Sequence, residues 1–153
     1  MSEKIIRTRI AAAPPPDPCN GCTGCAMRCS AGIPLTRKEF ELIVAHLRSL
    51  EPEQVRRVLE QEKSLPWFED IFREACLFLD LKDNYCLIYP VRPMICRLFG
   101  KVPWLPCPEE KAVPQLHDPT GIVKDYCREP RKTFPEWQAE SGLFDVKDLL
   151  RKT

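Results

Sequence analysis

Residues 19–29 read CNGCTGCAMRC and place four cysteines, Cys19, Cys22, Cys25 and Cys29, in one short loop. The spacing is C-x2-C-x2-C-x3-C, by which ferredoxin-type loops bind a four-iron cluster, usually with one ligand supplied from elsewhere. Glycines stand immediately before the second and third cysteines, where they let backbone N–H groups turn toward the sulfurs. The run therefore predicts a loop wrapped around a metal centre.

Iron and zinc make different demands on such a loop. A single zinc ion prefers a compact tetrahedron, commonly built from two separated C-x2-C knuckles. Four consecutive ligands from one short loop would be crowded around one ion, whereas three thiolates two residues apart can reach three corners of a cubane cluster. We therefore expect an iron–sulfur cluster of the 4Fe-4S type, with zinc as the alternative if remote residues complete the site.

Five isolated cysteines follow: Cys76, Cys86, Cys96, Cys107 and Cys127. The total of nine is odd, and residues 1–13 hold charges and only brief apolar runs, which does not indicate an export signal. We expect a cytoplasmic protein with reduced thiols, so metal ligation is favoured over disulfides. Two four-thiolate centres would use eight of the nine cysteines. For one or two of the isolated five the alternative is a buried apolar role, with Cys76 as the best candidate.

The charge balance argues against polyanionic partners. The chain has 23 Lys and Arg against 22 Asp and Glu, a net charge of +1. Neither nucleic acid nor an anionic membrane is therefore expected to bind, which leaves a redox or other protein partner. No phosphate-binding glycine loop, nucleophile elbow or pair of catalytic carboxylates is recognisable, so no catalytic residue is assigned and an enzymatic role stays open.

Apolar residues recur at helical spacing in the first half of the chain. Thr36 and Glu39 have the form of a capping box and open an amphipathic helix. Pro52 is placed for the first turn of a second helix, and Pro66 similarly opens a third. The residues expected to face inward from that third helix are Trp67, Ile71, Phe72, Ala75 and Leu79.

The remaining segments are expected to be less regular. A proline cluster predicts an extended arm at residues 1–18. A turn at Asp83-Asn84 precedes one short extended piece over residues 85–89. Nine of the sixteen prolines fall within residues 90–135, which predicts irregular chain there. A short helix around Trp137, Leu143, Phe144 and Leu149 is expected to close the chain.

These elements predict the fold class. We expect a mainly α, small metal-stapled single domain with irregular Pro-rich segments. The domain would occupy residues 19–153, after the arm, and one core of modest size fits its length.

Three motifs together resemble a known family. They are Cys19-x2-Cys22-x2-Cys25, Cys76-Leu-Phe-Leu, and Cys86-Leu-Ile-Tyr-Pro-Val-Arg-Pro-Met-Ile-Cys96-Arg. Over about residues 19–100 this combination resembles the bacterial YkgJ-type CxxCxxCC cysteine-cluster family of zinc- or iron-chelating domains. The resemblance implies metal binding through six cysteines, Cys19, Cys22, Cys25, Cys76, Cys86 and Cys96, and so reverses the apolar interpretation of Cys76.

The chain departs from the family motif at one position. The motif ends in two adjacent cysteines, but Ala26 stands where the second would be, and Cys29 is the candidate replacement. Cys107 and Cys127 lie outside the matched block and could complete a second site.

Two arginines, Arg92 and Arg97, accompany the block that carries Cys86 and Cys96. A guanidinium there could donate hydrogen bonds to cluster sulfurs or offset the charge of several thiolates. We select Arg97 as the cofactor-binding candidate, with an ordinary surface salt bridge as the alternative.

The family also includes the flagellin lysine N-methylase, which raises a role in methyl transfer. A chain of 153 residues leaves no room for a barrel that would hold substrate or cofactor, and the radical-SAM spacing C-x3-C-x2-C is absent. We therefore expect one or two iron–sulfur clusters that serve electron transfer or redox sensing. The alternatives are a zinc-stapled structural or adaptor module and an accessory protein in a methyl-transfer or metal-delivery system.

Overall fold

The structure, a computed structural model, describes residues 23–151. Within that range the α-helices are α2 (Arg37–Ser49), α3 (Pro52–Leu59), α4 (Met94–Arg97), α5 (Pro119–Cys127), α6 (Phe134–Glu140) and α7 (Val146–Leu150). Two 3-10 helices, η1 (Gly24–Arg28) and η2 (Tyr89–Val91), accompany them. The expected arm at residues 1–18 and the first two cysteines, Cys19 and Cys22, lie outside the described residues.

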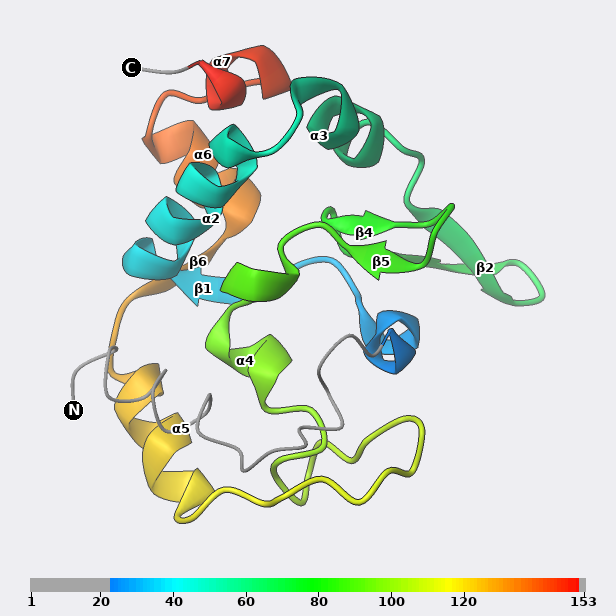
Figure 1. Cartoon of the computed structure of the whole chain (residues 1–153), viewed down its shortest axis with the longest axis vertical. Coiled ribbons are helices and arrows are strands. Elements are labelled where there is room, and N and C mark those ends of the chain that lie inside the picture. Colours follow the sequence, from blue (N-terminus) through cyan, green and yellow to red (C-terminus); the bar gives the residue numbers. More distant parts are fainter. Residues whose placement is uncertain (1–22, 152–153) are drawn as a thin grey trace.

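The strands form three antiparallel pairs among the described residues. The pairs are β1 (Pro34–Thr36) with β6 (Arg131–Thr133), β2 (Ser64–Phe68) with β3 (Ile71–Glu74), and β4 (Leu79–Asp80) with β5 (Tyr85–Cys86). The first pair joins segments that are far apart in the sequence, whereas the other two are local hairpins (Figure 1). The mainly helical fold class is thus confirmed in part, with small sheets added to it.

Helices α2 and α3 confirm the first two predicted helices. The Thr36 hydroxyl accepts a hydrogen bond from the Glu39 amide, and the Glu39 carboxylate accepts one from the Thr36 amide, which is the predicted capping box. Both helices contribute to the main apolar core, together with α6 and α7. The fully buried members of that core are Ile43, Leu47, Val55, Val58, Leu87 and Leu149.

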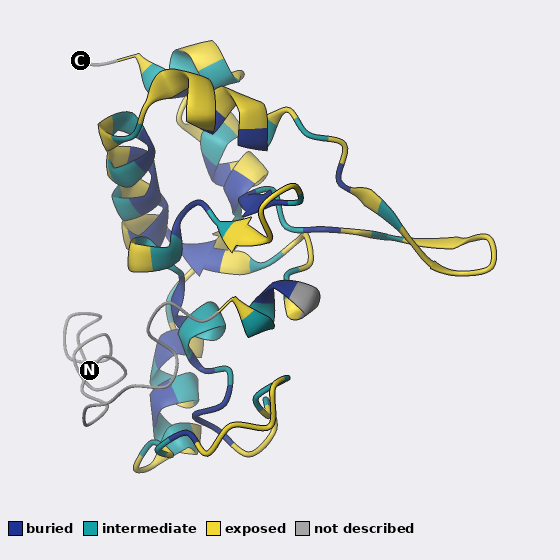
Figure 2. Ribbon diagram, turned by 45° about the vertical axis from the view of Figure 1, so that its right-hand side comes forward, coloured by how far each residue is buried: buried dark blue, intermediate teal, exposed yellow. Residues whose placement is uncertain are grey.

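The predicted third helix is wrong, because residues 64–74 form a β-hairpin. Glu69 has φ +45° at the turn between the strands, a conformation that a helix does not contain. The hairpin of β2 and β3 projects from the body of the molecule in Figures 1 and 2. The apolar side chains beside its turn are exposed instead of facing inward: Trp67 73%, Phe68 64%, Ile71 54% and Phe72 61%. Of the expected inward stripe, only Ala75 and Leu79 are buried.

The predicted turn at Asp83-Asn84 is confirmed, and Asn84 has φ +52°. It joins β4 to β5 in a register that pairs Leu79 with Cys86. The extended piece is shorter than expected, since η2 begins at Tyr89.

The Pro-rich segment at residues 90–135 is less irregular than predicted, because it contains α4 and α5. Asp118 caps α5 by accepting a hydrogen bond from the Gly121 amide at 3.2 Å, and Pro119 occupies the first turn. Ile122 and Tyr126 of α5 are buried in a second apolar cluster with Met94 of α4. These two helices therefore make their own small core.

The closing helix is divided in two. Gly142 has φ +73° and separates α6 from α7, since this left-handed conformation ends a helix without steric cost to glycine. Trp137 of α6 and Leu149 of α7 are buried, whereas Phe144, between the two helices, is 76% exposed. None of the described helices is both long and apolar enough to cross a membrane.

Candidate metal centre

Five cysteines from separate parts of the chain line one pocket of about 170 Å³. They are Cys25 and Cys29 at η1, Cys76 after β3, Cys86 on β5, and Cys96 on α4. Figure 1 shows η1, in blue, and α4 on the same side of the β4–β5 hairpin. The fold therefore brings cysteines from distant parts of the sequence to one pocket, as the sequence predicts.

Backbone contacts bring the η1 loop and the segment after β3 together. The Cys76 amide donates to the Cys29 carbonyl at 3.2 Å, and a β-bridge joins the adjacent residues Ser30 and Ala75. The Cys29 thiol in turn donates to the Cys25 carbonyl at 3.6 Å. The η1 loop is thereby held against the end of the exposed hairpin, and its two thiols face the same pocket as Cys76.

The rest of the pocket wall is mostly apolar. Its large apolar side chains are Ile33, Leu35, Leu77, Phe78, Ile88, Phe99 and Phe134. Phe78 and Phe134 pack edge to face, with ring centroids 4.9 Å apart, so part of the wall belongs to the main core. Such a wall excludes water from sulfur atoms bound within it.

Burial makes ionisation of the pocket thiols difficult in the metal-free protein. Burial, followed by the proximity of Cys76, Cys86 and Cys25, raises the pKa of Cys29 to about 12. Burial similarly raises the pKa of Cys86 to about 11. Burial and the neighbouring thiols raise the pKa of Cys96 well above its ordinary value. The pocket thus gathers thiols that cannot carry several negative charges without a cation among them.

The local backbone favours the thiolate form at two of these positions. Burial raises the pKa of Cys76, but the amides of Phe78 and Leu79 donate toward its sulfur and lower it again in part. The Ile88 amide acts in the same way on Cys86. Amides directed at a sulfur stabilise a metal-bound thiolate and tune its electron density, so this backbone suits a cysteine ligand.

The thiols share the pocket without converging on one point. Within residues 23–151, no three Cys, His, Asp or Glu side chains come close enough together to hold a metal ion. The donor set itself fits, because thiolate sulfur is the ligand that zinc and iron–sulfur clusters prefer.

Two cations lie next to this set of thiols. Arg92 lines the pocket and lowers the pKa values of Cys29, Cys86 and Cys96 electrostatically. Lys63 stands near Cys76, and its own pKa is lowered by burial.

Lys63 belongs to a polar network behind the β4–β5 hairpin. It is 5% exposed, so its side chain lies inside the molecule. Its ammonium donates to the Leu79 carbonyl and, at 3.1 Å, to Gln61 Oε1. Gln61 then donates to Asp80 Oδ1 at 2.9 Å, and Arg57 donates to Asp80 Oδ2 at 2.7 Å. The network fixes the strand that follows Cys76.

The other predicted site residues lie elsewhere. Cys127 is exposed at the end of α5, and Cys107 lies in the loop before that helix; neither lines the pocket. Cys19 and Cys22 lie outside the described residues. All seven described cysteines are free thiols.

Arg97 also does not line the pocket. Its guanidinium donates to the carbonyls of Pro90 and Arg92 at 2.7 and 2.8 Å, so it holds the chain between η2 and α4 in place. Its role as a cofactor-binding residue stays a prediction.

Sequence reasoning missed Lys63 altogether. It lies among charged residues after a predicted helix, where a lysine is ordinarily solvated, and no local signal marks its burial. Arg92 could be found, since it stands within the block between Cys86 and Cys96, but only the fold shows that it faces the thiols.

A small, mainly helical domain with a pocket lined by thiols from distant segments defines the class of cysteine-rich metal-binding domains. The chain belongs to the CxxCxxCC family, described as "Putative zinc- or iron-chelating domain", which it matches over residues 18–128. The match extends beyond residue 100, where the resemblance was expected to end, and so includes Cys107 and Cys127. No solved structure matches the chain.

Proposed function

We propose that the protein binds one iron–sulfur centre in the thiol pocket and serves in electron transfer or redox sensing. The observation that carries this proposal is the gathering of five thiols, from η1, the end of β3, β5 and α4, around one cavity. The family is compatible with either iron or zinc.

The number of thiols favours a cluster over a single ion. A structural zinc site uses four ligands, and five thiols already line the pocket. Cys19 and Cys22 precede the pocket residue Cys25 by a few positions and complete the ferredoxin-type spacing. A polynuclear centre can use more than four thiolate ligands, whereas one zinc ion would leave at least one pocket thiol without a metal bond.

The chain's own residues would hold and shield the centre. Cysteine thiolates would be its ligands, and the amides directed at Cys76 and Cys86 would stabilise their charge. The aromatic wall would keep water away. When bound, an iron–sulfur cluster supplies reversible one-electron transfer, and the pocket residues set its potential.

A protein redox partner and a reducing cytoplasm complete the proposal. The net charge of +1 gives no broad attraction to nucleic acid or an anionic membrane. A thiol-ligated cluster also needs cysteines that stay reduced until it is assembled.

The test is anaerobic purification of the full chain, followed by iron, zinc and acid-labile sulfide analysis. We expect iron and sulfide in similar amounts, with visible absorption that dithionite bleaches. A colourless protein with stoichiometric zinc and no sulfide would instead establish the zinc-stapled module. Chelation should then unfold the protein, because metal binding would supply folding free energy.

A further inference from the structure

Arg92 differs from the other arginines in what its charge faces. It follows η2 and is half-buried in the pocket wall. Its guanidinium carbon lies 3.7 Å from the centroid of the Tyr89 ring, and its Nε donates to the Tyr89 carbonyl at 3.0 Å. Ring stacking and this hydrogen bond hold the guanidinium in one orientation. Tyr89 therefore fixes a positive charge at the edge of the thiol pocket.

No carboxylate neutralises this charge within residues 23–151. The ion pairs in that range engage other arginines or Lys132, for example Arg57 with Asp80 at 2.7 Å, and none engages Arg92. Its side chain lines the same pocket as Cys29, Cys86 and Cys96. These come from three different segments, so Arg92 acts on the assembled pocket and not on one loop.

We propose that Arg92 is the charge-compensating residue of the metal centre: it offsets the negative charge of the thiolate ligands and thereby sets metal affinity and reduction potential. This inference rests on the proposed function. A centre with four thiolate ligands is negatively charged, and the apolar wall supplies little solvation for that charge. A fixed guanidinium stabilises the centre, and it stabilises the reduced form more because that form carries one more negative charge.

The affinity test uses Co²⁺ as the probe, titrated anaerobically into the metal-free full chain in competition with a chelator. We expect Arg92→Gln to weaken Co²⁺ binding about 10- to 100-fold, the usual effect of losing a group that supports metal ligands. Arg92→Lys keeps the charge but loses the stacking geometry, so its affinity should stay within about threefold of the wild type.

A matched control removes an arginine of similar burial far from the pocket. Arg48 on α2 donates from Nε to the Leu149 carbonyl at 2.8 Å, much as Arg92 does to Tyr89. Arg48→Gln should cost some stability but leave Co²⁺ affinity unchanged. Comparison of the two glutamine variants separates the effect of charge at the pocket from the effect of a lost backbone contact.

A second measurement is the reduction potential of the anaerobically purified protein. Arg92→Gln should shift the potential to more negative values, because the reduced centre loses its compensating charge, and Arg92→Lys should restore it. A purely structural role would not give rescue by lysine.

The outcomes separate this inference from the proposed function. If the wild type binds Co²⁺ but Arg92→Gln binds it equally well, the inference about Arg92 is wrong and the metal site stands. If the wild type shows no sulfur-to-cobalt charge-transfer band and the anaerobically purified protein also holds neither iron with sulfide nor zinc, the thiol pocket is not a metal site and both fall. If Arg92→Gln does not fold, Arg92→Lys still decides: a loss of tenfold or more with lysine overturns the proposal.

Discussion

The hydroxyl of Tyr126 donates a hydrogen bond of 2.5 Å to Oε2 of Glu39, and both side chains are buried. The other carboxylate oxygen of Glu39 accepts a bond from the Met94 amide at 2.8 Å. One acidic side chain on α2 therefore contacts α5 and the first turn of α4, the helix that bears Cys96. Glu39 therefore links the second apolar cluster to the main helical core. Because α4 carries Cys96, the same contact also holds that part of the pocket wall in place.

Tyr126→Phe should destabilise the metal-free protein by about 1–2 kcal/mol. The substitution removes one partner of a buried carboxylate while leaving the ring in place, and buried polar groups that lose a partner cost roughly this much. Urea unfolding measured by circular dichroism would give the difference.

The matched control is Glu41→Gln on the exposed face of the same helix. Its ion pair with Arg37 has side chains 58% and 57% exposed, so we expect a change below about 0.5 kcal/mol. Equal effects for the two substitutions would contradict the structural role assigned to Glu39.

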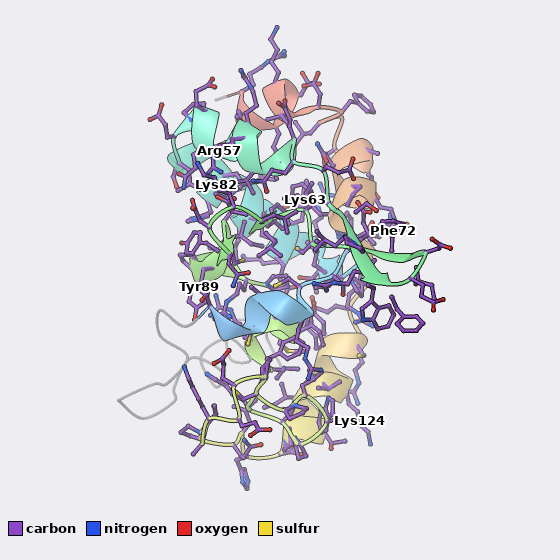
Figure 3. All side chains as sticks on the ribbon, turned by 90° about the vertical axis from the view of Figure 1, so that its right-hand side faces the viewer. Arg57, Lys63, Phe72, Lys82, Tyr89 and Lys124 are labelled. Carbon is purple, nitrogen blue, oxygen red and sulfur yellow. The ribbon has the colours of Figure 1, made fainter. Side chains whose placement is uncertain are left out.

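The exposed hairpin gives a prediction that separates the observed fold from the predicted helix. Phe72 is 61% exposed on β3, so Phe72→Ser should change the free energy of unfolding by less than about 0.5 kcal/mol. Figure 3 shows Phe72 on the projecting hairpin. Phe78→Ala, at a core position that is 4% exposed, should cost about 3–5 kcal/mol. Thermal unfolding of both variants is the measurement, and a large loss for Phe72→Ser would favour the inward-facing stripe.

Local signals predicted the parts of the fold that are decided locally. The capping box of Thr36 and Glu39 and the proline at the start of α3 place two helices correctly. The hairpin was missed because Trp67 and Ile71 are four residues apart, a spacing compatible with a helical face as well as with two strands around a turn. The positive φ of Glu69 distinguishes the hairpin from a helix. A glutamate in the sequence does not predict a positive φ, so this turn could not be recognised beforehand.

The candidate site was predictable as a set of thiols and not as an electrostatic environment. Spacing marks Cys25 and Cys29, and the family resemblance adds Cys76, Cys86 and Cys96, all of which line the pocket. The buried cation at Lys63 depends on Gln61, Asp80 and the Leu79 carbonyl, which tertiary packing brings together, so the sequence carries no local mark of it.

Asp80 predicts how stability depends on pH. Burial alone would raise the pKa of Asp80, but hydrogen bonds from Arg57, Gln61 and the Lys82 amide outweigh it and hold the pKa well below its usual range. The unfolded value is about 4, so the folded state binds the proton less tightly than the unfolded state. The stability that Asp80 contributes is fully present above about pH 4 and is lost as the pH falls below that value.

Asp80→Asn should lower stability at pH 7 by about 1–3 kcal/mol and flatten the loss of stability below pH 4. The control is Asp83→Asn: this side chain is 64% exposed and lies 4.0 Å from Arg57, so a small effect is expected. Urea unfolding from pH 3 to pH 7 measures both. An acid transition in Asp80→Asn as steep as in the wild type would assign the pH dependence to other carboxylates.

Cys96→Ser and Cys127→Ser distinguish a pocket thiol from a thiol elsewhere in the family match. Cys96 lies in the pocket wall beside the other thiols, so its loss should reduce the bound iron and sulfide and weaken Co²⁺ binding more than about tenfold. Cys127 is exposed and outside that wall, so its substitution should leave the metal content of the pocket intact. Metal and sulfide analysis of both anaerobic preparations is the measurement. If Cys127→Ser halves the metal content while the pocket centre persists, Cys127 belongs to a second centre, because a single pocket site cannot depend on a thiol that it does not contact.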